Sequence, residues 1–415
     1  MSELDFSTSQ EELEDKETTL DDLLGLNDSE SGSGTEEDTS FNEEEEYVLE
    51  EEHVRVSTKK VSDILKTAGV VSKGSGRDVV ARTIGFKVEG GQLWVMITDA
   101  DIYVKKAIPL LNSSNVLEDF IPVSLPAVME LVKLCGSTFT LFKKDGAYFL
   151  KVMGGDAEVE VVDVGEDQFS LDFVGEKESL GSMTSNTFYQ VLKNLYPLAN
   201  SGVTPSQRRI FFSDKGALSV YLISVAMFDK EKFPKMDLSV KDIKILYVLT
   251  SSSEAKELHV YRQENRIYLS TNDFVYSVGV ADYSPSKNML ESVEKIIASN
   301  SPVYVNYNQL SKAADHASNT VNGSISRIFF SYTEDGFVKA SIKKKDKRKD
   351  INMVLMGAPN DSPKQFSGEV SIQSNLLRSL LKVFAQDSMV GLILNKDGIG
   401  VVSDSFKSVL YIDSE

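Results

Sequence analysis

The sequence predicts an α+β fold of three tandem domains, each built from one strand–helix–strands unit used twice, with antiparallel sheets outside. The first observation is a hairpin pattern, in which apolar residues flank a Gly-containing turn. It occurs at residues 84–97, 208–227 and 327–342, so the copies lie about 120 residues apart. Such a period indicates one structural unit used three times. The second observation is a helical apolar pattern before each hairpin and again after it, which gives six half-repeats of the form β-α-β-β-β.

The first domain begins with a short strand at residues 54–56 and a helix. Ser57 is the expected N-cap of this helix, and Val61, Ile64 and Leu65 fall at helical spacing. The other elements expected in this domain are strands at 84–86, 93–97, 102–108 and 120–123, a helix at 125–134, and strands at 138–142, 147–152 and 158–164.

The second and third domains repeat this order. Residues 208–227 are expected to form one strand, a turn at Asp214-Lys215-Gly216, and one further strand. The second domain also has expected helices at 186–198 and 240–250 and strands at 238–240, 257–261, 266–270 and 274–280, and a helical connector follows at 291–298. The third domain has expected strands at 303–305, 327–330, 337–342, 351–356, 368–372, 389–394, 398–403 and 408–412, with helices at 309–318 and 375–384. The predicted boundaries are a tail at 1–52 and domains at 53–178, 179–300 and 301–415.

The net charge of −19 belongs to the N-terminal tail. Residues 1–52 hold 21 acidic residues and one Lys, a net charge of −20, which leaves 43 basic and 42 acidic residues in the rest of the chain. So acidic a segment, poor in aromatic residues, cannot bury enough apolar surface to offset its ordering entropy, and we expect it to be disordered. Residues 20–26 (Leu-Asp-Asp-Leu-Leu-Gly-Leu) are either a motif that folds onto a partner or chance leucines in a solvated tail.

Composition excludes several classes of protein. No stretch approaches the roughly 18 consecutive apolar residues of a membrane span, and the N-terminus lacks the basic and apolar regions of a secretory signal. The single Cys135 lies in an apolar helical pattern and is expected to be a buried small hydrophobe. A cytoplasmic location fits this composition.

No catalytic or cofactor-binding pattern is present, so the sequence predicts a protein that is not an enzyme and needs no metal or cofactor. His53, His259 and His316 have no ligand spacing between them. Residues 73–77 (Lys-Gly-Ser-Gly-Arg) lack the order of a phosphate-binding P-loop. Asp99 and Asp101 could hold a cation, but a strand end beside a turn is the favoured interpretation.

Positive charge is concentrated on the six predicted helices, which carry ten basic and four acidic residues. Positive charge without interleaved aromatic residues is typical of contact with the phosphate backbone and not with bases. The alternative is that these lysines simply solvate exposed helix faces. The run at residues 343–349 is interpreted as a solvated hairpin tip, with contact to nucleic acid or a partner as the lesser alternative. The DNA-binding candidates are Lys59, Lys60, Lys66, Lys73, Arg77, Lys133, Lys193, Lys241, Lys244, Lys312, Arg378 and Lys382.

The chain resembles the bacterial DNA polymerase III β sliding clamps and their phage relatives over residues 53–415. Residues 98–102 (Thr-Asp-Ala-Asp-Ile) resemble the family's Thr-Asp-Leu-Glu segment, and residues 121–123 (Ile-Pro-Val) resemble its Val-Pro-Ala element. Residues 281–285 (Ala-Asp-Tyr-Ser-Pro) lie where the family has an Asp-Gly-x-Phe-Pro turn.

The resemblance implies a head-to-tail homodimer whose six domains form a ring, with helices lining a hole around duplex DNA. It implies sequence-independent DNA binding, with a DNA polymerase and a clamp loader as partners. Arg77 matches a loop arginine that approaches DNA in the family. Partners would insert a short motif into a pocket between the second and third domains, with walls at Leu222, Val225, Met227, Pro285, Met289, Val409, Leu410, Tyr411 and Ile412.

The sequence departs from the family at this pocket. The family's Thr-Asp-Gly-His-Arg-Leu segment is Leu-Ile-Ser-Val-Ala-Met at residues 222–227, and its terminal Met-Pro-Met-Arg-Leu is Tyr-Ile-Asp-Ser-Glu at residues 411–415. The acidic tail has no counterpart in the family.

From the resemblance as a whole, the predicted function is a processivity clamp that tethers a replicative polymerase to DNA. The alternatives are a clamp-like adaptor in transcription or repair, including a viral one, and a structural protein with the same fold.

Overall fold

The computed structural model describes residues 51–73, 78–99, 101–114, 116–169, 177–281, 283, 287–319, 326–342, 351–355, 357 and 366–412, without the side chains of Lys287 and Asn288. Several sequence predictions therefore lie outside the described residues. These are the acidic tail with its leucine motif at 20–26, Arg77, Pro285 and the lysine-rich run at 343–349.

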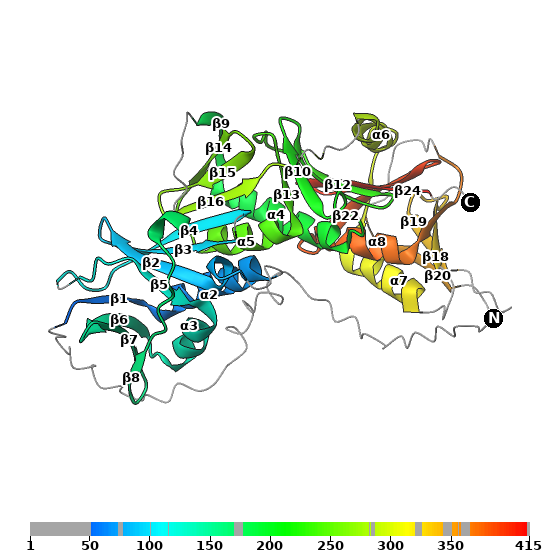
Figure 1. The fold of residues 1–415 in the computed structure, drawn as a ribbon. Coiled ribbons are helices and arrows are strands. Elements are labelled where there is room, and N and C mark those ends of the chain that lie inside the picture. Colours follow the sequence, from blue (N-terminus) through cyan, green and yellow to red (C-terminus); the bar gives the residue numbers. More distant parts are fainter. Residues whose placement is uncertain are drawn as a thin grey trace, which may run out of the picture. The chain divides into compact units, whose positions relative to one another are not determined.

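Four antiparallel sheets form the framework (Figure 1). Sheet A contains, in spatial order, β1 (His53–Ser57), β6 (Thr138–Lys144), β7 (Ala147–Val152) and β8 (Gly155–Glu158). Sheet B contains β5 (Ile121–Ser124), β2 (Thr83–Glu89), β3 (Gln92–Thr98), β4 (Ile102–Pro109), β16 (Phe274–Gly279), β15 (Arg266–Ser270), β14 (Glu257–Gln263) and β9 (Glu178–Thr184). Sheet C contains β13 (Met236–Ser239), β10 (Arg209–Ser213), β11 (Gly216–Tyr221), β12 (Ser224–Phe228), β24 (Phe406–Tyr411), β23 (Gly398–Val402), β22 (Met389–Asn395) and β17 (Val303–Asn306). Sheet D contains β20 (Ile351–Leu355), β19 (Val338–Ile342), β18 (Arg327–Tyr332) and β21 (Val370–Gln373).

Neighbouring half-repeats exchange their first strands. Strand β1 leads into the first helix but pairs with β6 of the next half-repeat, while β5 pairs back with β2. The same exchange joins β9 to β14 and β13 to β10, and then β17 to β22 and β21 to β18. Each half-repeat therefore supplies a strand that completes the sheet of the other, so the two halves of a pair fold together.

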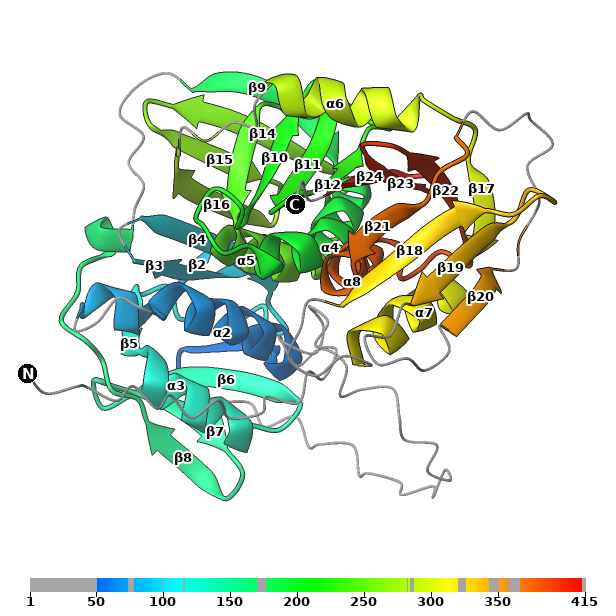
Figure 2. The same ribbon diagram turned by 90° about the vertical axis from the view of Figure 1, so that its right-hand side faces the viewer.

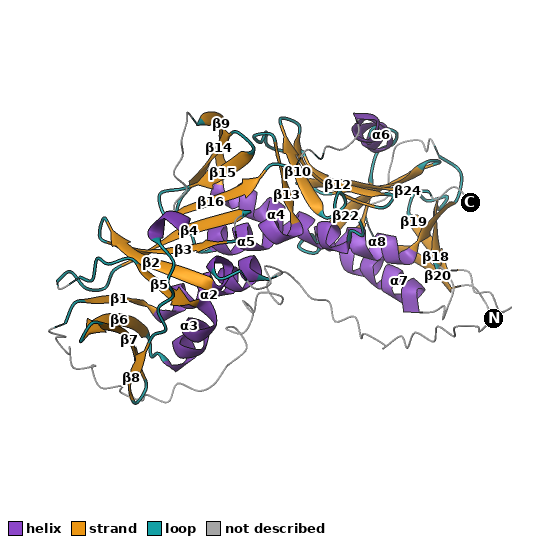
Figure 3. Cartoon of the chain, viewed as in Figure 1, coloured by secondary structure: helices purple, strands orange, loops and turns teal. Residues whose placement is uncertain are grey.

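Six helices follow the leading strands and form one row. They are α2 (Thr58–Ser72), α3 (Leu125–Leu131), α4 (Ser185–Ser201), α5 (Val240–Ser251), α7 (Tyr307–Asn319) and α8 (Ser374–Leu381). Contacts run in the order α3, α2, α5, α4, α8, α7, and Figure 3 shows these helices gathered along one side of the sheets. Helix α4 buries Phe188, Val191, Leu192 and Leu195 against the sheets, at the predicted spacing. A seventh helix, α6 (Lys287–Ile297), lies apart from this row (Figure 2).

Short 3₁₀ turns complete the described elements, at Val80–Arg82, Val132–Leu134, Glu166–Phe169 and Lys382–Phe384. Two of them extend α3 and α8, which accounts for the longer helices that the sequence predicts at 125–134 and 375–384. Cys135 is buried, as predicted.

Two sequence predictions of strands are wrong. The strand expected at 158–164 is β8 at Gly155–Glu158, because Gly154 and Gly155 have positive φ angles of 96° and 154° and turn the chain back at once. The second strand of the segment 208–227 is divided into β11 and β12 by a turn at residues 222–223, where Leu222 has a φ of 49°. Ser57 is the N-cap residue of α2, although its side chain makes no capping hydrogen bond.

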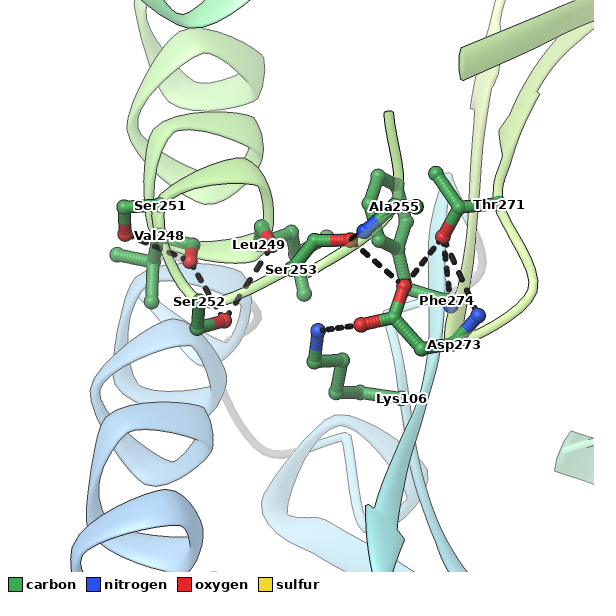
Figure 4. A network of polar contacts seen from close by, with 10 residues as sticks. All are labelled: Lys106, Val248, Leu249, Ser251, Ser252, Ser253, Ala255, Thr271, Asp273 and Phe274. Atoms are coloured by element: carbon green, nitrogen blue, oxygen red, sulfur yellow. Dashed lines mark hydrogen bonds and ion pairs between the residues drawn. The ribbon is translucent and has the colours of Figure 1, made fainter. Parts of the chain in front are cut away.

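A buried ion pair joins sheet B where β4 pairs with β16. Lys106 Nζ lies 2.7 Å from Asp273 Oδ2, and the Lys106 side chain is only 6% exposed. Asp273 Oδ1 also accepts hydrogen bonds from Ser253 Oγ at 2.8 Å and Thr271 Oγ1 at 2.5 Å (Figure 4). Burial alone would raise the pKa of Asp273, but the hydrogen bonds from Lys106, Thr271 and Ser253 outweigh it and lower that pKa.

The Asp273→Ala substitution should therefore lower the free energy of unfolding by about 3–5 kcal/mol, because it leaves the Lys106 ammonium buried without a partner. The matched control is Asp119→Ala, which breaks the exposed pair with Lys143 and the hydrogen bond from Tyr148 and should cost far less. The folded-state pKa of Asp273 is lowered. Its contribution to the free energy of unfolding is therefore present at neutral pH, and it is lost as the pH falls below the usual pKa range of an aspartate. Urea denaturation of both variants at pH 7 and pH 3 measures this, and equal costs at pH 7 would contradict it.

Candidate nucleic-acid interface and partner surface

The predicted basic residues of the helix row are exposed or half-buried. Eleven of the twelve candidates lie within the described residues, and none of these eleven is fully buried. Five are exposed, namely Lys59, Lys60, Lys73, Lys133 and Lys312. Six are half-buried, namely Lys66, Lys193, Lys241, Lys244, Arg378 and Lys382.

Carboxylates neutralise part of this charge. Lys66 pairs with Asp63 at 3.4 Å and Lys133 with Glu130 at 2.9 Å, each within one helix. Arg378 of α8 pairs with Asp315 of α7 at 2.9 Å. Lys241 pairs with Asp99 at 2.6 Å, and Asp99 also accepts a hydrogen bond from the Ile102 backbone, so it closes a strand end as the sequence predicts.

Several basic residues line one cleft between the end of α2, the start of α5 and residues 203–208. The cleft has a volume of about 460 Å³, and its described lining contains no acidic residue. We call it the basic cleft. Its cationic lining residues are Lys73, Arg208, Arg209, Lys241 and Lys244.

The positive charges of the basic cleft are only partly neutralised. Arg209 is neutralised by Asp237 and Lys241 by Asp99. Burial lowers the pKa of Lys244, and the positive charges of Lys73 and Arg208 lower it further. The N-terminus of α5 is closed by a capping box of Ser239 and Asp242, whose carboxylate offsets the positive end of the helix dipole. A phosphate group would relieve this repulsion.

Sequence reasoning missed Arg208 and Arg209 as cleft residues. Both are visible as the Arg-Arg pair that opens the second hairpin. The pairing of β10 with β13 holds both arginines beside the start of α5, and the contact between α2 and α5 brings Lys73 to the same cleft. Local sequence patterns contain neither contact.

The residues predicted to wall a partner pocket fall into two groups. Val225, Met227 and Val409 form one apolar cluster on sheet C, against which Met289 and Tyr411 pack. Helix α6 covers this cluster, so Val225 and Val409 are fully buried and Met227 is only 8% exposed. Their role in partner binding stays a prediction.

The other predicted wall residues lie elsewhere. Leu410 follows Val409 in β24, so it points to the opposite face of sheet C. Leu222 is 47% exposed in the turn between β11 and β12, and Ile412 is half-buried after β24. An open cavity of about 550 Å³ lies beside the covered cluster, which the sequence did not indicate, and its apolar lining includes Phe211, Leu218, Met227, Ile267, Tyr283 and Leu290.

The described residues contain no group of three His, Cys, Asp or Glu side chains placed to hold a metal ion. Within the same part of the chain, no helix is both long and apolar enough to span a membrane.

No protein-family model and no curated protein matches the sequence. Solved structures do match over 88% of this chain. They include the DNA polymerase III β subunit of Thermotoga maritima, with a TM-score of 0.67, 13% identity and 99% of its own chain covered. The DNA polymerase sliding clamp of Pseudomonas aeruginosa has a TM-score of 0.66, 14% identity and 99% coverage. The Helicobacter pylori β clamp bound to a DNA ligase peptide has a TM-score of 0.67, 11% identity and 100% coverage.

The chain has the sliding-clamp fold. Identities of 11–14% establish the fold, and the predicted fold class is confirmed. Within the clamp fold, the helix row corresponds to the six half-repeat helices that the sequence predicts.

The Arg208→Gln substitution should raise the pKa of Lys244, because it removes one of the two positive charges that lower it. Burial is unchanged, so the pKa should stay below the ordinary value of a lysine. Side-chain NMR of isotopically labelled lysine during a pH titration measures the shift. Lys133→Gln, which changes a lysine paired with Glu130, is the control and should leave the pKa of Lys244 unchanged. The same pKa in all three proteins would mean that Arg208 does not face Lys244.

Proposed function

We propose that this protein is a sliding clamp, which encircles duplex DNA without sequence preference and tethers a replicative polymerase and other partners to it. The observation that carries the proposal is the gathering of basic residues on the helix row of a clamp fold, including the five that line the basic cleft. Phosphate contact without base contact gives attraction that is independent of sequence and compatible with sliding.

The ring would be a head-to-tail homodimer joined at the ends of sheets A and D. Strands β8 and β20 are edge strands of these sheets, each hydrogen-bonded to one neighbouring strand among the described elements. In β20, Val354 is 55% exposed, an apolar side chain on an unpaired edge. Unpaired edges are templates for pairing with another chain, which supports closure through β8 of one protomer and β20 of its partner.

The remaining parts of the proposal concern domains and partners. Domains at 53–178, 179–300 and 301–415 fit the three pairs of half-repeats with exchanged strands. The similarity to a clamp solved with a DNA ligase peptide supports binding of short partner segments, with a polymerase and a clamp loader as the proposed partners. A role without catalysis, in the cytoplasm on bacterial or phage DNA, completes the proposal.

Replacing four helix-row lysines by Glu should abolish retention on circular DNA, because it reverses charge where the phosphates pass. The four are Lys59, Lys66, Lys193 and Lys382. A matched control makes the same change at four exposed hairpin or loop lysines, Lys144, Lys215, Lys230 and Lys396, and should retain DNA. Each lost phosphate contact should also reduce the slope of log K against log salt by about 0.9. Retention on circular and linearised DNA after loading measures the effect, and equal loss in both variants would show that the helix row does not face DNA.

The Val354→Glu substitution should convert the dimer to a monomer, because it places a charge in the apolar edge pairing of β20. The control is Leu111→Glu, which changes a residue that is 59% exposed outside the edge strands and should leave the dimer intact. Light scattering coupled to gel filtration measures both masses. A wild-type protein that is monomeric at micromolar concentration would contradict the ring.

A further inference from the structure

The acidic tail, residues 1–52, carries almost the whole net charge of the chain. It holds 21 acidic residues and one Lys, whereas the rest of the chain holds 43 basic and 42 acidic residues. Its acidic residues include unbroken runs at 43–46 and 50–52, directly before the first described strand. The chain therefore joins a strongly anionic segment covalently to a fold that gathers cations on one row of helices.

The helix row and the basic cleft hold cations that no carboxylate neutralises. Among the described residues, Lys59, Lys60, Lys73 and Arg208 are exposed and have no ion-pair partner. Lys59 and Lys60 lie in the first turn of α2, which contains no acidic residue, so they add to the positive end of the helix dipole. Lys73 follows the last residue of the same helix and lines the basic cleft with Arg208. Both ends of α2 therefore attract anions.

The tail is joined to the fold close to these cations. It ends at β1, a strand of five residues, which leads directly into the 15 residues of α2. At about 3.4 Å per strand residue and 1.5 Å per helix residue, Lys60 lies within about 25 Å of the end of the tail and Lys73 within about 40 Å. An extended chain covers about 3.3 Å per residue. Residues 43–46 can therefore reach the first turn of α2, and residues 36–38 can reach Lys73.

Attachment to the same chain makes such contacts intramolecular. A tethered segment acts at an effective concentration of about a millimolar, so ion pairs that are individually weak are enough to hold it. Duplex DNA carries about one negative charge per 1.7 Å, which is a denser and stiffer line of charge than a peptide. DNA that lies along the whole helix row should therefore displace the tail, whereas DNA that touches the row briefly meets cations that are already screened.

We propose that the acidic tail binds its own helix row, at α2 and the basic cleft, and competes there with duplex DNA. The tail takes the place of DNA phosphates at Lys59, Lys60 and Lys73 and leaves when a duplex occupies the whole row. Binding of stray nucleic acid is thereby weakened more than retention of an encircled duplex. The contact depends on charge and reach alone, and only the identity of the competitor, DNA, rests on the proposed function.

Two full-length variants test the contact. The tail variant replaces five glutamates by Gln, at Glu43, Glu44, Glu45, Glu46 and Glu50. The matched control replaces, by Asn or Gln, five exposed acidic residues in hairpin turns of the described part, namely Asp145, Asp214, Glu264, Asp335 and Asp397. Each variant removes five negative charges, so a difference between them depends on where the charge lies and not on the net charge.

Lysine acetylation without DNA, followed residue by residue by mass spectrometry, measures the contact directly. Lys59, Lys60 and Lys73 should react at least threefold faster in the tail variant than in the wild type or the control, because ion pairing protects an amine. The exposed loop lysines Lys230 and Lys235 should react equally in all three proteins. At about 1 M salt, where the Debye length falls to about 3 Å, the protection should vanish. Equal rates at Lys59, Lys60 and Lys73 in all three proteins at low salt would overturn the proposal.

Fluorescence anisotropy with a short labelled duplex measures the competition. The tail variant should bind this DNA at least threefold more tightly than the wild type and the control. Faster acetylation without tighter DNA binding would overturn the competition. If none of the three proteins binds or retains DNA, the proposed function fails, while acetylation still decides whether the tail contacts the helix row.

Discussion

The structure depends on backbone pairing between strands of different repeats. Exchanged strands such as β1 and β5 join the two half-repeats of each pair, and β4–β16 and β12–β24 continue sheets B and C from one pair to the next. A continuous antiparallel sheet fixes which face every side chain points to, because a shift of one residue would reverse them all. The helices that follow the leading strands therefore gather in one row. Strand pairing and contacts between neighbouring helices together bring charges that are far apart in sequence close to one another.

Most of this framework could be predicted from the sequence, because its signals are local. Apolar alternation marks β10 and β11, and helical spacing marks α4 through Phe188, Val191 and Leu192. The prediction failed where a backbone conformation overrode the pattern. Leu222 adopts a φ of 49°, which is unusual for a leucine and is not indicated by the sequence. The chain also reverses after Val152, at Gly154 and Gly155.

The candidate sites were less predictable, because they arise from contacts between distant segments. Lys73, Arg208 and Lys244 belong to three different segments. The pairing of β10 with β13 places Arg208 beside α5, and the packing of α2 against α5 adds Lys73. The apolar residues Val225 and Val409 were identifiable as candidates from resemblance. Their cover by α6 was not, because an amphipathic pattern at 291–298 indicates a helix without indicating the surface on which it packs.

In the proposed clamp, the charge balance of the helix row would favour holding DNA by topology more than by affinity. At least four of the predicted cations, Lys66, Lys133, Lys241 and Arg378, already have carboxylate partners within 3.4 Å. Every cation that contacts a phosphate adds about 0.9 to the magnitude of the slope of log K against log salt. It also strengthens binding at one position along the duplex. Neutralised cations lower that grip, while the basic cleft keeps one concentrated point of attraction. The proposed closed ring, with its positive charge partly neutralised, would retain DNA because the DNA passes through it. The remaining contacts could then exchange from phosphate to phosphate as the ring moves.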